Sequence, residues 1–264
     1  MPTTYTHDLF GKKVYKKLPK EMKEVIRENK DLYRIGLHGP DIFFYLLQKS
    51  SVPAFGNQMH KECARFFFQE AMAQVREEMD RPLLAYLIGF GCHYLLDSTC
   101  HPYVGQMVDE GVITHTLLEK EWDRALMEAN GMDPLTSRPS DALVPKMEYA
   151  EVIHKVLPLV SVKDIYNTIR MQVFILNRMV YGKKGTMRKI MTAVLGKAKN
   201  PDTREITDHF MRREAAPESI APVAVLNDLF EKALQEAPAE LEQLYSLAYS
   251  DKELTDRWSL TYNG

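Results

Sequence analysis

The sequence predicts an all-α fold, built as a single compact multi-helix domain that spans residues 1–264. Two observations predict this class: apolar residues recur at helical spacing along most of the chain, and few alternating, β-branched runs bounded by turn residues occur. A third observation concerns function, because six of the eight histidines fall within residues 7–115.

The composition excludes several classes of protein. The chain is 45% hydrophobic and 27% charged with a net charge of −2, which argues against disorder and against a strongly basic nucleic-acid coat. The three cysteines form no CxxC pair, so a reducing compartment is expected. No secretory signal is apparent at the N-terminus, and the apolar stretch 83–96 is shorter than the ~20 residues that span a bilayer. A cytoplasmic location is therefore expected.

Three helices are predicted in the first half of the chain. Residues 59–79 place apolar side chains at spacings of three to five with charged residues between them. Residues 83–100 are more uniformly apolar and predict a buried central helix, begun by Pro82 and stopped by Pro102. Residues 113–130 predict a third helix, ended by Gly131 at the position of a left-handed C-cap.

Further helices are predicted beyond a polar, proline-containing connector at 133–145. They cover residues 147–157, 162–181, 186–199, 203–213 and 220–247, so that 146–264 forms the helical remainder of the same domain. Two basic runs stand out, one between residues 12 and 23 and one between 183 and 199. Both are typical of solvated helix faces, and a phosphate- or membrane-facing role is an alternative for the second run.

Two predicted helices carry a histidine and a carboxylate four residues apart. His93 and Asp97 form the first pair, and His101 follows after four more residues. His115 and Glu119 repeat the spacing on the next helix. Residues four apart share one helix face, and imidazole and carboxylate are ligands that zinc accepts. One such pair alone is more often a hydrogen-bonded polar pair than a metal site.

The surroundings of the first pair favour a metal. Its helix is otherwise apolar, and ionisable groups buried there cost several kcal/mol unless a metal or a partner compensates them. Two such helices in succession therefore predict a metal cluster in the helix core, with all its ligands within residues 1–130.

Three upstream residues fit the same cluster. The run from Gly36 to Asp41 reads Gly-Leu-His-Gly-Pro-Asp, a turn after which Asp41 would lie in the first turn of a helix. His60 lies near the start of the 59–79 helix, and His7 lies near the N-terminus. Each of the three would be unremarkable in isolation, as a helix-start carboxylate or a surface histidine.

In order along the chain, these residues resemble the zinc-dependent phospholipase C family, to which the single-strand-specific zinc nucleases are distantly related. The resemblance covers about the first 130 residues. It rests on His7, the Gly-x-x-Gly-Pro-Asp run ending at Asp41, His60, His93-Tyr94-Leu95-Leu96-Asp97, His101 and His115-Thr116-Leu117-Leu118-Glu119. The fold that it implies is a compact all-α domain of about this length, as the periodicity predicts.

The resemblance implies two or three zinc ions. One ion would be held by Asp41, His60, His93 and Asp97, and a second by His101, His115 and Glu119. A third would be bound by Asp97 together with His7 and the N-terminal backbone. Asp41 would also act as the general base toward the attacking water.

The expected function is a zinc-dependent phosphoester hydrolase, because paired divalent ions polarise phosphoryl oxygens and lower the pKa of a bound water from 15.7 toward about 7. The expected partner is a small phosphorylated molecule or a phospholipid head group, with transient contact to a membrane surface. The aromatic choline contacts of the family are unmatched at Ile42 and Asn57, which gives little reason to expect selection of choline. Nucleic acid is an unlikely partner, although a zinc nuclease acting on single strands is one alternative. A non-catalytic metal-binding helical domain is another.

Other notable residues receive ordinary interpretations. His38 is a candidate partner of a ligand or an alternative ligand, since it lies three residues before Asp41. His154 and His209 are expected at the surface, and Cys92 and Cys100 as small buried side chains.

Overall fold

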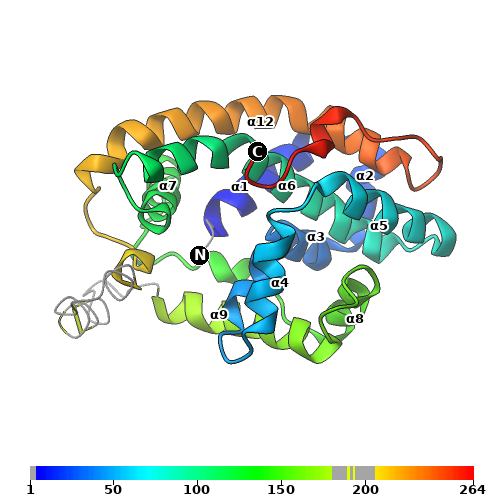
Figure 1. The fold of residues 1–264 in the computed structure, drawn as a ribbon, viewed down its shortest axis with the longest axis horizontal. Helices are drawn as coiled ribbons and strands as arrows, with labels where there is room; N and C mark the ends of the chain where they lie inside the picture. Colours follow the sequence, from blue (N-terminus) through cyan, green and yellow to red (C-terminus); the bar gives the residue numbers. More distant parts are fainter. Residues whose placement is uncertain (1–3, 180–188, 191–192, 194–205) are drawn as a thin grey trace.

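The computed structural model describes residues 4–179, 189–190, 193 and 206–264, and within these ranges the chain is helical and contains no strand, as predicted (Figure 1). The helices and short 3₁₀ turns form one compact domain. The α-helices are α1 (Thr4–Lys17), α2 (Lys20–Glu28), α3 (Lys30–Gly36), α4 (Ser51–Met59), α5 (Ala64–Glu78), α6 (Arg81–Asp109), α7 (His115–Ala129), α8 (Met147–Val156), α9 (Val162–Met179) and α12 (Ile220–Ser246). The 3₁₀ turns are η1 (Gly39–Tyr45), η2 (Pro139–Ala142), η3 (Ile206–His209), η4 (Pro217–Ser219) and η5 (Asp256–Ser259).

Helix α6 is the buried central helix that the sequence predicts. Every residue from 83 to 98 is buried, with α1, α3, α5 and α12 packed around the helix. The Asp80 carboxylate accepts a hydrogen bond from the backbone N–H of Leu83 at 2.9 Å, and Pro82 occupies the first turn. This capped start fixes where the helix begins and therefore which face its ligand pair presents.

Pro102 does not end this helix, so that prediction was wrong. The helix continues past Pro102 even though proline lacks the N–H and crowds the carbonyl four residues earlier. The chain near the C-terminus supports this turn, because the guanidinium of Arg257 donates to Ser98 Oγ at 2.9 Å and to the Leu95 carbonyl at 3.1 Å. These distant contacts, absent from local spacing, keep His101 on the helix.

Two glycines let α3 and α6 touch. A Cβ atom on Gly36 would lie 2.2 Å from the carbonyl oxygen of Tyr86, and one on Gly89 would lie 2.2 Å from that of Tyr33. Only glycine fits at such a crossing. The close approach brings the turn after α3 against the central helix.

The helix expected over 59–79 corresponds to α5, which begins five residues later, at Ala64, after an extended Cys63. Residues 51–59 form a separate helix, α4, which was not predicted and which ends at Met59 with His60 at its C-cap. The backbone N–H of Ala64 donates to the carbonyl of Leu260 at 3.2 Å. A segment two hundred residues away thus separates the helices, which the local periodicity could not indicate.

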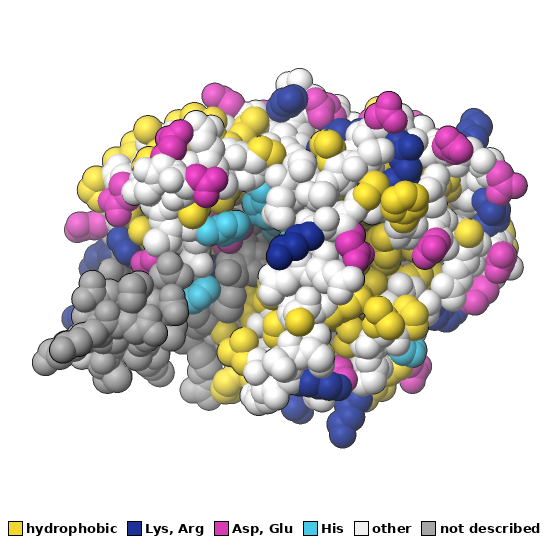
Figure 2. All heavy atoms as spheres, in the orientation of Figure 1, with side chains coloured by type: hydrophobic (Ala, Val, Ile, Leu, Met, Phe, Trp, Pro, Cys, Tyr) yellow, Lys and Arg dark blue, Asp and Glu magenta, His cyan; other side chains and the backbone are white. Residues whose placement is uncertain are grey.

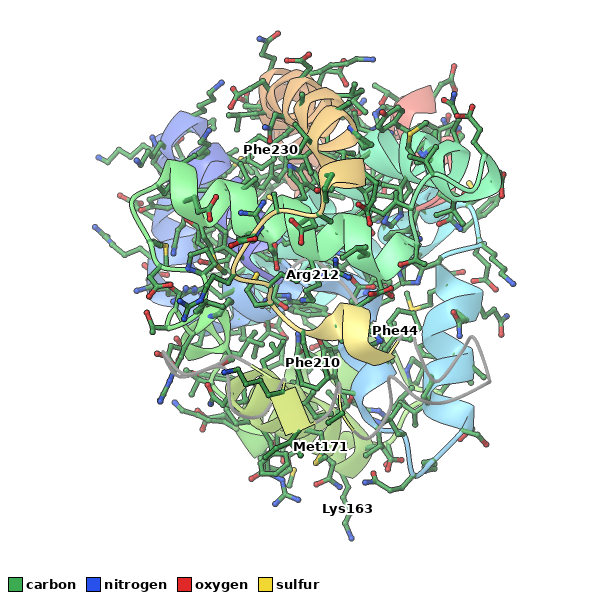
Figure 3. The ribbon with its side chains drawn as sticks, turned by 90° about the vertical axis from the view of Figure 1, so that its left-hand side faces the viewer. Phe44, Lys163, Met171, Phe210, Arg212 and Phe230 are labelled. Carbon is green, nitrogen blue, oxygen red and sulfur yellow. The ribbon has the colours of Figure 1, made fainter. Side chains whose placement is uncertain are left out.

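The prediction of a helix at 203–213 was also wrong in the part of this range that the structure describes, residues 206–213. Only η3 is helical there, and the chain from 210 to 216 is irregular. Phe210 and Met211 pack with Tyr5 and Met127 in a small apolar cluster below α7 (Figure 3). This packing replaces helix formation as the way in which the segment buries its apolar side chains.

The remaining predicted helices agree with the structure where it describes them. Helices α8, α9 and α12 match the predictions to within two residues at each end. The helix predicted at 186–199 and most of the second basic run lie outside the described residues. None of the described helices combines the length and the apolar character needed to cross a membrane.

Candidate metal centre

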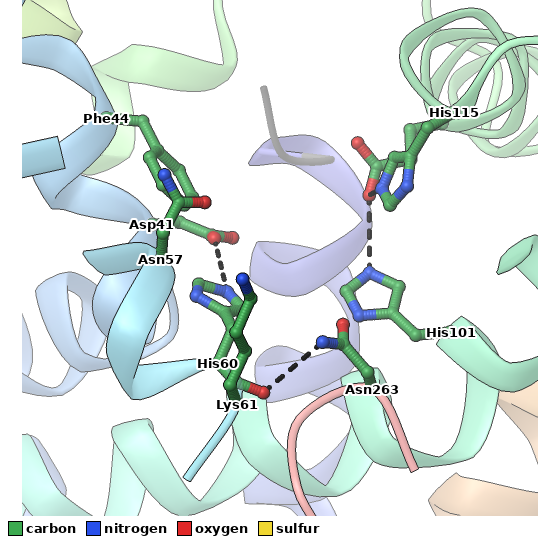
Figure 4. A pocket seen from close by; sticks show the side chains of 9 residues that line it. Asp41, Phe44, Asn57, His60, Lys61, His101, His115 and Asn263 are labelled. Atoms are coloured by element: carbon green, nitrogen blue, oxygen red, sulfur yellow. Dashed lines mark hydrogen bonds and ion pairs between the residues drawn. The ribbon is translucent and has the colours of Figure 1, made fainter. Parts of the chain in front are cut away.

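A pocket of about 350 Å³ opens where η1, α4, α6 and α7 meet, and Figure 2 shows histidine side chains on this face. Five predicted ligands line it, and the other three lie buried beneath it. The close view in Figure 4 shows the lining: Asp41, Phe44, Asn57, His60, Lys61, His101, His115, Glu119 and Asn263. The structure therefore gathers all the sequence-predicted ligands in one place.

Four of the ligands form a buried group: His7, Asp41, His93 and Asp97 approach within 4.8 Å of one another through one ligand atom each. Asp97 joins two helices, because its Oδ1 lies 3.2 Å from His7 Nε2 and its Oδ2 lies 3.0 Å from His93 Nε2. Asp41 Oδ2 lies 3.9 Å from the same nitrogen of His93. All four side chains are buried, and Asp41 alone among them lines the pocket.

Three further ligands form an open group: His101, His115 and Glu119, which also approach within 4.8 Å. Glu119 Oε1 lies 3.0 Å from His115 Nε2 and 3.5 Å from His101 Nε2. The His115 side chain is 47% exposed, so this group faces the pocket and the solvent. Asp97 Oδ2 lies 3.8 Å from His101 Nδ1, which places the two groups side by side.

His60 lies at the edge of the buried group. Its Nε2 is 3.0 Å from Asp41 Oδ1, and its Nδ1 is 2.7 Å from the carbonyl oxygen of Gly56. The family resemblance places His60 with Asp41, His93 and Asp97, and assigns His7 to a third ion. In the structure His7 is the residue that completes that set, with His60 in contact with it through Asp41.

The buried group fits a metal ion. His93 Nε2 and Asp97 Oδ2 lie 3.0 Å apart, yet the geometry is not that of a hydrogen bond, and neither atom has a hydrogen-bond partner. The Nδ1 atoms of His93 and His7 are also unpartnered. Buried polar atoms without partners are costly and rare, and convergent imidazole and carboxylate atoms are the donor set that zinc prefers.

Backbone carbonyls orient two of the imidazoles. Gly56 O faces His60 Nδ1, and Tyr262 O lies 3.2 Å from His101 Nδ1. When Nδ1 carries the proton and donates it to a carbonyl, Nε2 is left free to bind a metal. Both Nε2 atoms are in fact the ones directed at Asp41 and Glu119.

A buried carboxylate from α7 fixes the start of α1 and with it His7. Asp123 accepts hydrogen bonds from the backbone N–H of Thr6 at 2.9 Å and from Thr6 Oγ1 at 2.7 Å. The first turn of a helix leaves its N–H groups without intrahelical partners, so a carboxylate there is stabilising. The start of α1, and with it His7, is therefore held by the helix that carries the open group.

The turn before Asp41 requires glycine at position 39. Gly39 has a φ of +46°, and a Cβ atom there would lie 2.2 Å from Cδ2 of His93. Both the left-handed backbone and the close approach to the imidazole exclude a larger residue. This explains the second glycine of the Gly-x-x-Gly-Pro-Asp run.

The electrostatics keep the carboxylates ready for a cation. Burial alone would raise the pKa of Asp97, but His101, His93 and His7 hold it well below its usual range. Burial is likewise outweighed at Glu119, whose pKa is lowered by its two neighbouring imidazoles. Burial also opposes protonation of His101, yet the two carboxylates raise its pKa to about 10. A metal that binds here must therefore displace a proton.

The three histidines that are not predicted ligands are all buried or partly buried. His38 belongs to neither group, yet it is fully buried and both of its ring nitrogens lack a hydrogen-bond partner. Burial, and to a smaller extent the nearby His7, lowers its pKa to about 3. His154 and His209, both expected at the surface, are partly buried, and burial lowers the pKa of His209 to about 3.

Several residues of the site were missed by sequence reasoning. Lys61 and Phe44 lie within a few positions of predicted ligands, so inspection of their neighbourhood could have found them. Asp123, Tyr262 and Asn263 carry no local signal, because their roles depend on contacts across more than a hundred residues.

An all-α domain with a buried His/Asp cluster suits a metal-dependent hydrolase. The model of one family, described as zinc dependent phospholipase C, matches residues 6–176, which is well over half of the chain. The chain therefore belongs to the zinc-dependent phospholipase C family. No curated protein and no solved structure matches it.

Proposed function

We propose that this protein is a zinc-dependent phosphodiesterase that hydrolyses the phosphate ester of a phospholipid head group. The observation that carries the proposal is that the buried group and the open group of ligands lie side by side at one pocket. Adjacent divalent ions suit a phosphoester better than an amide, because its non-bridging oxygens can bridge two ions.

The two groups would hold two ions. His7, Asp41, His93 and Asp97 would bind one, with His60 available beside Asp41, and His101, His115 and Glu119 would bind the other. Asp97, which lies near histidines of both groups, would connect them. Zinc supplies Lewis acidity toward a phosphoryl oxygen and makes a water acidic enough to attack near neutral pH.

Asp41 is the proposed general base. It lines the pocket, and its Oδ1 lies 3.0 Å from His60 Nε2, which would bind the ion or, when protonated, donate to this carboxylate. A carboxylate oxygen at the pocket that is not bound to an ion can accept the proton of the attacking water.

The other side chains of the pocket suit a phosphate rather than a cationic head group. Lys61 projects into the pocket in Figure 4 and forms no ion pair with any described residue. Its ammonium group and the amides of Asn57 and Asn263 can bind phosphoryl oxygens. Phe44 is the single aromatic ring in the lining, and a lysine beside it opposes a trimethylammonium group.

Metal analysis combined with a generic diester tests the proposal. The purified protein should contain two or three zinc equivalents and hydrolyse bis-p-nitrophenyl phosphate, and Asp41→Asn should lower turnover far more than the melting temperature. Protein that stays metal-free and helical without responding to zinc would contradict it. If His93→Ala and Asp41→Asn only lower the melting temperature and no turnover is found, the metals are structural. Faster cleavage of single-stranded oligonucleotides than of phospholipid would identify a nuclease instead.

A further inference from the structure

A second cavity, of about 510 Å³, lies beside the metal pocket and is mostly apolar. Helices α4 and α5 form one wall, with Phe55, Met59 and Phe67. The end of α8 and the segment that follows it form the other, with Val156 and Leu157. The only charged side chains in its lining are Glu62 and Glu70. We call this cavity the apolar groove.

The apolar groove and the metal pocket share a wall. Tyr262 lines the groove, and its ring centroid lies 5.4 Å from that of His60 and 5.9 Å from that of His93. Met59 lines the groove and the next residue lines the pocket. A molecule with its phosphate at the ligands could therefore reach the groove by crossing one narrow ridge.

Large apolar side chains stand exposed at the edge of the groove. Phe66 is 67% exposed and Leu159 is 83% exposed, and they come from opposite walls. Figure 2 shows an apolar area over α5 and α8 on the same face as the histidines. Contiguous exposed apolar surface next to a binding pocket marks a site that is covered by another apolar body.

We propose that the apolar groove binds an acyl chain of the phospholipid substrate while the head-group phosphate lies in the metal pocket. This rests on the proposed function. The shared wall favours an acyl chain over a protein partner, because a single molecule then occupies both cavities. Phe66 and Leu159 would enter the lipid surface from which that chain is drawn.

Cys63 allows a direct test, because it lines the groove whereas Cys92 and Cys100 are fully buried. Addition of its thiol to N-octylmaleimide would fill the groove with an alkyl chain, and N-methylmaleimide would not. We expect the octyl adduct to lose at least tenfold activity on phosphatidylglycerol vesicles and to keep its activity on bis-p-nitrophenyl phosphate. The methyl adduct and octylmaleimide-treated Cys63→Ser should stay close to the untreated protein. Equal loss on both substrates, or no loss on vesicles, would overturn the proposal.

The length of the acyl chain gives a second readout, which tests this proposal separately from the proposed function. Binding of phospholipids with acyl chains of increasing length, measured by calorimetry, should tighten by up to about fourfold per methylene until the groove is full. The octyl adduct should lose this dependence. If no diester is hydrolysed, the proposed function fails while this binding series still decides the groove. Binding that does not change with chain length would overturn the groove proposal.

Charged substitutions of Phe66 and Leu159, the rim residues of the apolar groove, test its contact with lipid. Phe66→Asp and Leu159→Asp should each reduce sedimentation with phosphatidylglycerol vesicles at least fivefold, without changing bis-p-nitrophenyl phosphate turnover. Ile220→Asp is the matched control, because Ile220 is 64% exposed on α12 and does not line the groove. If the rim variants bind vesicles normally but lose a dimer seen by light scattering, the groove is an interface between copies and the proposal is wrong.

Discussion

The buried group and the open group use the same residue types in different surroundings. His93 is fully buried with unpartnered ring nitrogens, whereas the His115 side chain is 47% exposed and lies beside Glu119 at the pocket. The first environment makes each ligand part of the core, and the second leaves a ligand free to move with a substrate. We infer that His7, His93 and Asp97 of the buried group mainly stabilise the fold. Asp41 and the open group line the pocket and would mainly serve the reaction. Four predictions test this contrast, in the order of their expected effect on stability.

The largest effect is expected for His93→Ala. The change removes a fully buried ring and leaves a cavity between Asp97 and Asp41, and truncation of a large core side chain to alanine costs about 2–5 kcal/mol. The zinc-loaded variant should lose that much unfolding free energy in urea titrations and at least one zinc equivalent in metal analysis. A variant with an unchanged midpoint would show that the buried group does not support the fold.

Gly39→Ala should break the buried group indirectly. The new methyl group would collide with the His93 ring, and alanine is strained in the left-handed backbone conformation of position 39. The free energy of unfolding should fall by about 1–3 kcal/mol, and zinc should bind more weakly. Gly111→Ala is the control, because Gly111 has a φ of +69° and no atom within 4 Å of the added methyl. The control should lose stability from backbone strain alone and bind zinc normally. Equal zinc affinity in both variants would contradict the packing argument.

The pH dependence should differ between zinc-free and zinc-loaded protein. The pKa values of Asp97 and Glu119 are lower in the folded protein than in the unfolded chain, where they lie near 4. Their ionised forms therefore stabilise the fold above about pH 4, and this stabilisation is lost as the pH falls. His101 contributes in the opposite sense: its stabilisation is complete below about 6.5 and is lost as the pH rises through about 10.

The lowered pKa values of His38 and His209 remove stability as the pH falls below about 6.5, so zinc-free protein should melt at its highest temperature near pH 6.5. Zinc replaces the protons on the imidazoles, so the rise in melting temperature that zinc causes should grow from pH 6 to pH 8. Differential scanning fluorimetry with and without zinc measures both effects. A larger zinc effect at pH 5 than at pH 8 would contradict the proton displacement.

The smallest effect on stability is expected for His115→Ala. Its exposed side chain leaves no cavity, so the unfolding free energy of zinc-free protein should change by at most about 0.5 kcal/mol. Turnover of bis-p-nitrophenyl phosphate should still fall by at least about tenfold, because a metal ligand is lost. A large loss of stability with normal turnover would reverse the roles given to the two groups.

The sequence predicts the helical class and the ligand pairs well because both depend on short-range spacing. His93 and Asp97, and His115 and Glu119, are four residues apart on helices that the structure contains. Predictions fail where distant contacts override local preference. Pro102 stays inside α6 beneath Arg257, and the helix expected to begin at 59 begins at Ala64, whose backbone contacts the C-terminal segment.

The same reasoning explains which parts of the site escaped prediction. Asp123 resembles any other acidic residue in a helix until α1 is placed against it. Tyr262 contributes a carbonyl to His101 and a ring to the apolar groove, and neither function depends on residues near it in the sequence. Hydrophobic periodicity describes one helix at a time, so it gives no information on side chains that come into contact only in the folded domain.

The wide separation of these contacts has a consequence for folding kinetics. Asp123 binds Thr6 across 117 residues, and the Tyr262 carbonyl binds His101 across 161. Helical proteins usually fold fast because their contacts are local, and contacts this distant slow the search. The predicted ligands converge only after such contacts have formed. The complete zinc site therefore forms after the rate-limiting barrier of folding. Zinc should then leave the folding rate unchanged and slow the unfolding rate, which makes the metal a determinant of how long the native protein lasts.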